Sequence, residues 1–171
     1  RTEDNEIHYR MRKAGYKLCF DPDIISYQYT RSSLSSMLKQ KYANGFWIGK
    51  TSKVCPGCLS IYHFVPFAFV SAIIASGSVI GATGLAECIK KRHNHTLGKG
   101  ISALRKVTVV LTTVMWVLYA LMASGMAAVS AFKAEDKRNI TNACLPVLFL
   151  LLHLSYGIGT IAGLMDKSKR G

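Results

Sequence analysis

Three long uncharged runs constrain this chain more than any other feature. They cover residues 59–86, 107–132 and 140–165. Each run is at or above the roughly 20 residues that a helix needs to cross the hydrocarbon core of a bilayer. The second run, VTVVLTTVMWVLYALMASGMAAVSAF, lacks the polar face that a surface helix of a soluble protein shows. The runs therefore predict an all-α membrane region with about three transmembrane helices, near residues 60–86, 107–132 and 140–165.

The charge of the chain also points to a membrane. Half of the 171 residues are hydrophobic (50%) and the mean hydropathy is +0.21, yet the formal net charge is +13. Between Asp23 and Glu87 there is no acidic residue, and this stretch carries the basic residues Arg31, Lys39, Lys41, Lys50 and Lys53. A basic segment directly before an apolar run suits an anionic lipid surface. Membrane lipids are the predicted partner rather than nucleic acid, because no zinc-finger, RRM or helix-turn-helix pattern accompanies the charge.

The sequence alone does not decide how the membrane region is oriented. If the amino-terminal part is cytoplasmic, three crossings place the loop KKRHNHTLGKGISALRK, residues 90–106, on the outer side. That placement contradicts the positive-inside rule. Either the first apolar run does not cross completely, or the part ahead of it overrides the rule. The first run contains Pro66 and three glycines, with which it can tilt, kink or end early.

Residues 1–30 are typical of the end of a soluble α/β domain. Acidic residues at the start of a helical stretch, basic residues at its end and the following Gly15 match the helix-dipole and capping preferences. The segments YKLCF and IISYQY, on either side of the turn DPD, predict two short strands. One helix and two strands cannot bury a core. We therefore expect them to complete a sheet formed by residues ahead of Arg1.

Residues 31–58 predict an amphipathic interfacial helix followed by a basic juxtamembrane linker. Ser32 or Ser33 is a suitable cap, and apolar residues recur every four positions from Leu34 to Phe46. Trp47 is suited to anchor such a helix among lipid headgroups. The alternative is a helix that packs into the core of the soluble domain.

Several motifs in order resemble a known family. The segments TED (residues 2–4), RMRKAGYKLCFDPD, YTRSSL and KQKYANGFW, then the apolar runs and the late PVLFLLLHLSYGIGTIAGL, resemble the carboxy-terminal half of a membrane-bound family 2 glycosyltransferase. Within that family the chain resembles the succinoglycan-type exopolysaccharide glucosyltransferases, and more distantly the cellulose and hyaluronan synthases. The resemblance implies that residues 1–30 end a nucleotide-diphospho-sugar transferase domain of the GT-A fold. It also implies an inverting hexosyl transfer from a nucleotide-sugar donor to a lipid-linked or polysaccharide acceptor in exopolysaccharide or cell-surface glycan biosynthesis.

The TED motif carries the predicted catalytic role. By the resemblance, Asp4 is the base that takes the proton of the acceptor hydroxyl, and Glu3 is its neighbour. A helix amino terminus favours the ionised form of Asp4, which the role requires. On periodicity alone, Glu3 and Asp4 are equally ordinary acids of a first helical turn.

A second motif suggests an acceptor site. Gln40 and Trp47 resemble the glutamine and tryptophan of the family's Q-x-x-R-W signature, which lines the acceptor site at the membrane face. The spacing is longer in this chain and no arginine precedes Trp47, so Lys41 or Arg31 would supply the cation for the diphosphate. This departure favours addition of a single sugar over processive synthesis. Trp47 is equally suited to be a headgroup anchor alone.

The resemblance further implies Mg²⁺ or Mn²⁺, held by an aspartate pair ahead of Arg1 rather than by residues of this chain. It places the protein in the bacterial inner (plasma) membrane with the catalytic part in the cytoplasm, and it implies that this piece alone is inactive. The competing hypothesis is a non-catalytic membrane module that anchors or docks a partner subunit. A transporter is disfavoured, because the predicted spans are few and contain no carboxylate for ion coupling.

The cysteines offer a rival chemistry. Cys55 and Cys58 form CPGC, which resembles half of a zinc ribbon or a redox pair. A closed zinc site needs four ligands, and Cys88, His93 and His95 lie beyond a predicted span. We favour a juxtamembrane turn with inert or acylated thiols.

Overall fold

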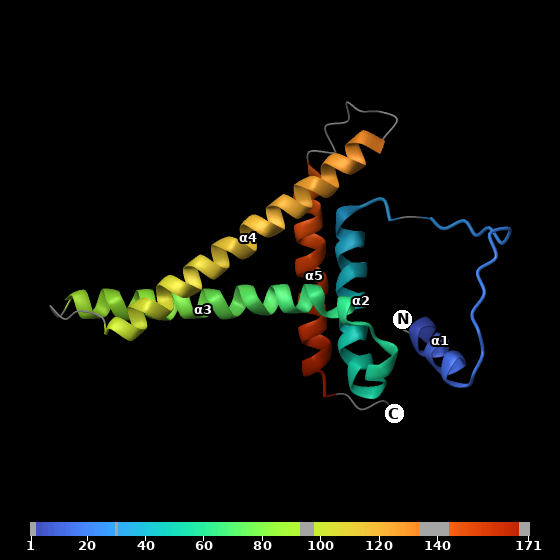
Figure 1. The fold of residues 1–171 in the computed structure, drawn as a ribbon, viewed down its shortest axis with the longest axis horizontal. Coiled ribbons are helices and arrows are strands. Elements are labelled where there is room, and N and C mark those ends of the chain that lie inside the picture. The colour runs from blue at the N-terminus through green and yellow to red at the C-terminus, as the bar shows by residue number, and fades with distance from the viewer. Residues whose placement is uncertain (1–2, 30, 93–97, 134–143, 168–171) are drawn as a thin grey trace. The chain divides into compact units, whose positions relative to one another are not determined.

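The computed structural model describes residues 3–29, 31–92, 98–133 and 144–167 (Figure 1). The described elements, in chain order, are α1 (Glu3–Lys13), α2 (Leu34–Val54), the short 3₁₀ turns η1 (Pro56–Cys58) and η2 (Ile61–Phe64), α3 (Val65–Arg92), α4 (Lys99–Lys133) and α5 (Leu145–Met165). The chain divides into two compact units. Residues 1–70 and 151–171 form the first unit, and residues 71–150 form the second.

Among the described residues, three helices are long and apolar enough to cross a membrane. They are Ile61–Arg92, Lys99–Ala131 and Leu145–Met165, with mean hydropathies of 2.0, 1.9 and 1.9. They lie on the three uncharged runs, as predicted, although α3 and α4 extend into the charged residues between the runs. Residues 140–143, at the predicted start of the third span, lie outside the described residues.

The predicted α/β tail is wrong. Residues 3–29 contain the helix α1 but no strand, and YKLCF and IISYQY are irregular chain on either side of a turn. In that turn the carboxylate of Asp21 accepts a hydrogen bond from the backbone N–H of Asp23, 3.0 Å away. A strand needs a neighbouring strand to pair with its backbone donors and acceptors. Because the described chain supplies no such neighbour, the apolar and aromatic residues of these segments do not form a sheet.

Helix α1 is confirmed, and the way it ends is clear. The backbone N–H of Gly15 donates to the carbonyl of Arg12, and that of Tyr16 donates to the carbonyl of Met11, each over 3.0 Å. This pair of bonds closes the helix in a Schellman motif. The motif needs a positive φ, and Gly15 adopts +89°. The sequence prediction of a stop at this glycine was therefore correct.

Helix α2 begins at a serine cap, as predicted. The hydroxyl of Ser33 accepts a hydrogen bond from the backbone N–H of Ser36 at 3.3 Å, which satisfies one of the free donors of the first turn. From this cap the helix continues to Val54. Its interfacial position in the membrane stays a prediction.

Helices α2 and α5 lie side by side in the first unit, with glycines in their contact (Figure 1). Gly45 and Gly49 of α2 face the backbone of α5, and Gly159 and Gly163 of α5 face the carbonyl groups of α2. A Cβ atom at any of the four would collide with the backbone of the partner helix. Each helix therefore contributes a Gly-x-x-x-Gly pair to one close contact, as in tightly packed membrane helices.

Two further contacts complete this packing. Thr160, between the two glycines of α5, is completely buried, and its hydroxyl donates to the carbonyl of Tyr156 at 3.1 Å. One turn away, Gly157 faces the backbone of Pro66 and the side chain of Val70 at the start of α3. The core of the first unit thus consists largely of backbone and small residues.

In the second unit, α3 and α4 are joined by a charged pair, in which the guanidinium of Arg105 binds the carboxylate of Glu87. The glycines of this part of α3 behave differently from those of α2 and α5. A Cβ atom at Gly77 or Gly81 would meet nothing within 4 Å. Their small-xxx-small spacing therefore makes no close helix contact among the described residues.

The glycine contact predicts opposite effects for two similar substitutions. Gly159→Ala places a methyl group against the carbonyl of Tyr42, so we expect it to lower the free energy of unfolding by about 1–3 kcal/mol. Gly81→Ala meets open space, and alanine favours a helix by roughly 0.5–1 kcal/mol over glycine, so this control should be neutral or stabilising. Unfolding in detergent micelles, followed by circular dichroism, compares the two. Equal stability of both variants would contradict the contact.

Candidate functional site

A mostly polar cavity lies at the amino end of α2, with a volume of about 630 Å³. It is formed by the irregular chain ahead of the helix, by the first two turns of α2 and by one side chain of α5. Polar and charged side chains dominate its lining: Gln28, Arg31, Ser36, Gln40 and Lys41. Met37 and Leu152 supply an apolar part.

The structure brings three predicted site residues together in this cavity, namely Arg31, Gln40 and Lys41. The local reason is helix geometry. Residues three or four positions apart lie on the same face of a helix. One face of α2 therefore presents Ser33, Ser36, Met37 and Gln40 together. Arg31 precedes the cap and reaches the cavity from the chain ahead of the helix.

The electrostatics of the cavity favour an anion. Arg31 and Lys41 are basic, and none of the described residues that line the cavity is acidic. The first turn of α2 adds the positive end of a helix dipole, together with backbone N–H groups that the helix itself leaves free. Phosphate and carboxylate groups bind at such helix ends.

Helix α5 holds the apolar wall of the cavity in place. The hydroxyl of Ser155 donates to the carbonyl of Leu38 at 2.8 Å. Leu152 lies one turn earlier on α5 and therefore faces the first turns of α2. The glycine contact therefore sets the distance of this wall from Gln40 and Lys41.

Trp47 does not line the cavity and lies in a second cluster farther along α2. The ammonium group of Lys50 lies 5.6 Å from the ring centre of Phe46 and 5.8 Å from that of Trp47. The same group pairs with the carboxylate of Asp166 at 2.9 Å. The role of Trp47 in acceptor binding stays a prediction. The structure shows only that its ring lies near the ammonium group of Lys50.

The predicted catalytic acids lie on α1. The side chain of Glu3 is outside the described part of the structure, whereas Asp4 is exposed in the first turn and no described residue pairs with its carboxylate. Helix α1 packs beyond the carboxyl end of α2, where Tyr9 contacts Gly57 of η1. The cavity is at the other end of α2, which has 21 residues and is therefore about 30 Å long. The structure does not bring Asp4 to the cavity.

The CPGC segment forms the turn η1. The thiol of Cys58 donates a hydrogen bond to the carbonyl of Cys55 at 3.0 Å. Desolvation, followed by the hydrogen bonding and charge of Cys55, raises the pKa of the Cys58 thiol to about 11. The thiol is therefore protonated at neutral pH. A cysteine acts as a nucleophile or metal ligand through its thiolate, so Cys58 is poorly suited to either role. Among the described residues, no group of three or more His, Cys, Asp or Glu could hold a metal ion; His93 and His95 lie outside them.

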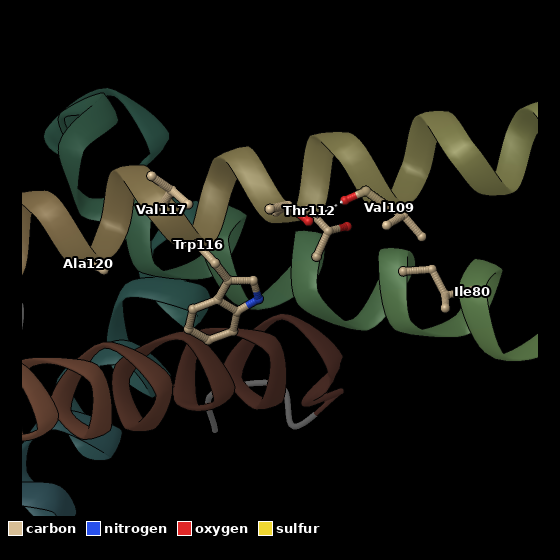
Figure 2. Close-up of a pocket in the computed structure, with 7 residues that line it drawn as sticks. Ile80, Val109, Thr112, Trp116, Val117 and Ala120 are labelled. Atoms are coloured by element: carbon tan, nitrogen blue, oxygen red, sulfur yellow. Dashed lines mark hydrogen bonds between the residues drawn. The ribbon is translucent and has the colours of Figure 1, made fainter.

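A second cavity of about 400 Å³ lies in the other unit, between α3 and α4. Figure 2 shows Val109, Thr112 and Trp116 projecting from α4 and Ile80 from α3. Thr112 and Thr113 of its lining donate to carbonyls of their own helix, at 2.7 Å and 2.9 Å, and the described lining residues carry no charge. Apart from the two threonines and Trp116, the described residues that line this cavity are aliphatic.

Comparison with known proteins shows a similarity to a glycosyltransferase over part of the chain. The chain is similar to a dolichyl N-acetyl-alpha-D-glucosaminyl phosphate 3-beta-D-2,3-diacetamido-2,3-dideoxy-beta-D-glucuronosyltransferase from Methanococcus voltae, with 32% identity over 73 residues. The match covers 43% of this chain and 22% of that protein, so the chain matches about a fifth of the length of this relative. No family model matches the chain. No solved structure matches it either.

Sequence reasoning did not identify the glycine pair of α2. Gly45 and Gly49 have the same spacing as Gly159 and Gly163, so the signal was present in the sequence. The glycine spacing in α2 was overlooked because α2 is too polar to be predicted as a membrane-spanning helix. Gln28 and Ser36 were also missed as lining residues, because nothing in their immediate sequence distinguishes them.

The raised pKa of Cys58 predicts slow alkylation. In a variant that keeps Cys55 and Cys58 and replaces the other three cysteines with serine, Cys58 of the folded protein should react with iodoacetamide at pH 8 at least tenfold more slowly than Cys58 of the same protein unfolded in detergent, where a thiol has a pKa of about 8.5. The difference should shrink as the pH rises toward 11, because the folded thiol then ionises. Rates measured by mass spectrometry check this. Equal folded and unfolded rates at pH 8 would rule out the shift.

Proposed function

We propose that this chain belongs to a glycosyltransferase that moves a sugar from a nucleotide-sugar donor to a lipid-linked acceptor at a membrane. The observation that carries the proposal is the basic cavity at the amino end of α2, which contains Arg31, Gln40 and Lys41. It is supported by the similarity to a transferase whose name specifies a dolichyl-linked, phosphate-bearing acceptor. An acceptor of this class needs a site for an anion next to an apolar membrane helix.

We assign each side chain of the cavity a part in holding such an acceptor. The guanidinium of Arg31 presents a planar fork of donors that matches two oxygens of a phosphate, and the ammonium of Lys41 adds a point charge. The amide of Gln40 can both donate to and accept from sugar hydroxyls. Met37 and Leu152 provide apolar surface for the first carbons of the lipid.

The proposed reaction is a displacement with inversion at the anomeric carbon. The oxygen of the acceptor hydroxyl forms a bond to that carbon, and the bond from the carbon to the donor diphosphate breaks. We propose Asp4, on the basis of the TED motif, as the carboxylate that receives the hydroxyl proton. For this role α1 has to lie closer to the acceptor than it does in this structure.

The chemistry of this transferase class uses Mg²⁺ or Mn²⁺ to neutralise the leaving diphosphate. The described residues do not fit such an ion, because no group of three or more possible ligands occurs among them. No step is therefore assigned to a metal bound by this chain. We further propose that the transfer takes place on the cytoplasmic face of the plasma membrane and serves cell-surface glycan synthesis.

The cavity predicts which lysine of α2 matters for the acceptor. In the full natural protein, Arg31→Gln and Lys41→Gln should each raise the KM for a lipid phosphate acceptor roughly tenfold or more, because each removes a hydrogen bond to a charged group. Lys39→Gln is the matched control, since Lys39 is exposed on α2 and does not line the cavity. Transfer of radiolabelled sugar from a panel of nucleotide donors to membrane lipid measures the effect. Equal KM values for the three variants would contradict the site.

The proposed base makes a separate prediction. In the full natural protein, Asp4→Asn should reduce turnover by about 100-fold or more while leaving donor binding unchanged, because the amide cannot accept the proton. Initial rates and donor binding by calorimetry are the measurements. Undiminished turnover would remove Asp4 from the mechanism. A natural protein that binds no donor and transfers nothing would favour the membrane-module hypothesis.

A further inference from the structure

Helices α2 and α5 contact each other in a constant register. Ser155 bonds the carbonyl of Leu38, so the two residues lie 117 positions apart. The next contacts keep this offset, because Gly159 faces the carbonyl of Tyr42 and Gly163 faces that of Phe46. The partners advance together, four residues at a time, along both helices. The two helices are therefore parallel.

The parallel pair is closed by charges at its carboxyl end. Lys50 pairs with the carboxylate of Asp166 at 2.9 Å, and the ammonium of Lys53 donates to the backbone carbonyl of Asp166 at 3.0 Å. The Lys50 and Asp166 side chains are only 20% and 26% exposed. The end of α2 and the end of α5 therefore lie at the same level, and on the same side of any membrane.

This geometry limits how often the chain crosses a membrane. The residues between α2 and α3 begin directly at the end of α2, so they lie on the same side as Asp166. Between these residues and Asp166 come the three helices that are long and apolar enough to cross. A chain that returns to its starting side has made an even number of crossings. The three helices cannot all cross completely while the α2–α5 contact exists.

The composition of α2 indicates which of the three apolar helices does not cross, because α2 is in contact with one of them, α5. Its 21 residues include four lysines and no acidic residue. Charged side chains are costly at the centre of a bilayer. A helix of this kind belongs at the headgroup level, with its lysines near anionic lipids. Because α5 is in contact with α2 along most of its length, it lies at the same depth.

We infer that α2 and α5 together form a surface that lies in the headgroup layer of an anionic membrane, so that α5 does not cross and the chain crosses twice, through α3 and α4. Three observations carry it: the contacts of α2 with α5, the chain order and the basic composition of α2. It does not depend on the proposed transferase activity.

The distribution of basic residues supports two crossings independently. Residues 1–60 contain ten of the 22 lysines and arginines, residues 133–144 contain three, and residues 166–171 contain three. With two crossings these sixteen lie on one side, and the six of residues 90–106 lie on the other. With a third crossing the division would be thirteen to nine. The stronger asymmetry satisfies the positive-inside rule with the amino-terminal part in the cytoplasm.

Cysteine labelling tests the number of crossings. In a variant with all five native cysteines replaced by serine, single cysteines are placed by Ser60→Cys, Lys99→Cys and Lys167→Cys. Sealed membrane vesicles are treated with a membrane-impermeant maleimide before and after they are opened by detergent, with labelling in SDS as the reference. We expect Ser60→Cys and Lys167→Cys to share one accessibility and Lys99→Cys to show the opposite one. Lys167→Cys behaving like Lys99→Cys would overturn the inference. A carboxy-terminal epitope tag, probed in the same vesicles, gives a second reading.

Tryptophan fluorescence tests the depth of α2. The chain has two tryptophans, so Trp116→Phe leaves Trp47 of α2, and Trp47→Phe leaves Trp116 near the middle of α4 as the matched control. Each variant is reconstituted into vesicles of phosphatidylcholine and phosphatidylglycerol carrying bromine either near the headgroup or deep in the acyl chain. Trp47 should be quenched more strongly by the shallow bromine, and Trp116 by the deep one. Stronger deep quenching of Trp47 would place α2 across the bilayer and contradict the inference.

Discussion

Direct backbone contact between α2 and α5 is the interaction on which the first unit depends. At four positions a glycine lets the backbones of the two helices touch, and each glycine faces a carbonyl oxygen or the peptide next to it. Contact this close maximises dispersion between the helices and permits weak Cα–H···O bonds. It also fixes rotation and register, because each glycine fits against one turn of the partner only. The ion pair of Lys50 with Asp166 then closes one end of the pair.

This packing explains how the polar helix α2 contributes to a cavity with both polar and apolar lining. Helix α5 covers one face of α2. The amino end of α2 lines the cavity, where its helix dipole acts together with Arg31, Gln40 and Lys41. Leu152 of α5 brings apolar surface to the same cavity. The cavity is thus mostly polar, with an apolar part formed by Met37 of α2 and Leu152 of α5. A phosphate attached to a lipid has the same division of character.

The sequence predicted much of the local structure and named some residues that line the candidate cavity. Uncharged runs predicted α3, α4 and α5, because helix formation and hydrophobicity are read from neighbouring residues. The serine cap of α2 and the glycine stop of α1 were predicted for the same reason. A motif grouped Gln40 with Trp47, and Lys41 or Arg31 was expected to supply the cation. Arg31, Gln40 and Lys41 line one cavity, whereas Trp47 does not. The strands at YKLCF and IISYQY were wrong, because alternation describes a strand only when another strand is present to bond with it.

The sequence by itself determined which segments are helical, which of them are apolar enough to cross a membrane, and that basic charge gathers on α2. These properties depend on residues within a few turns of one another. Only the tertiary structure decided that the pairs Gly45/Gly49 and Gly159/Gly163 each face the backbone of the partner helix, while Gly77 and Gly81 face open space. The three pairs have identical spacing, so spacing alone does not choose among them. The choice depends on the fit of two surfaces more than a hundred residues apart, which no local pattern records.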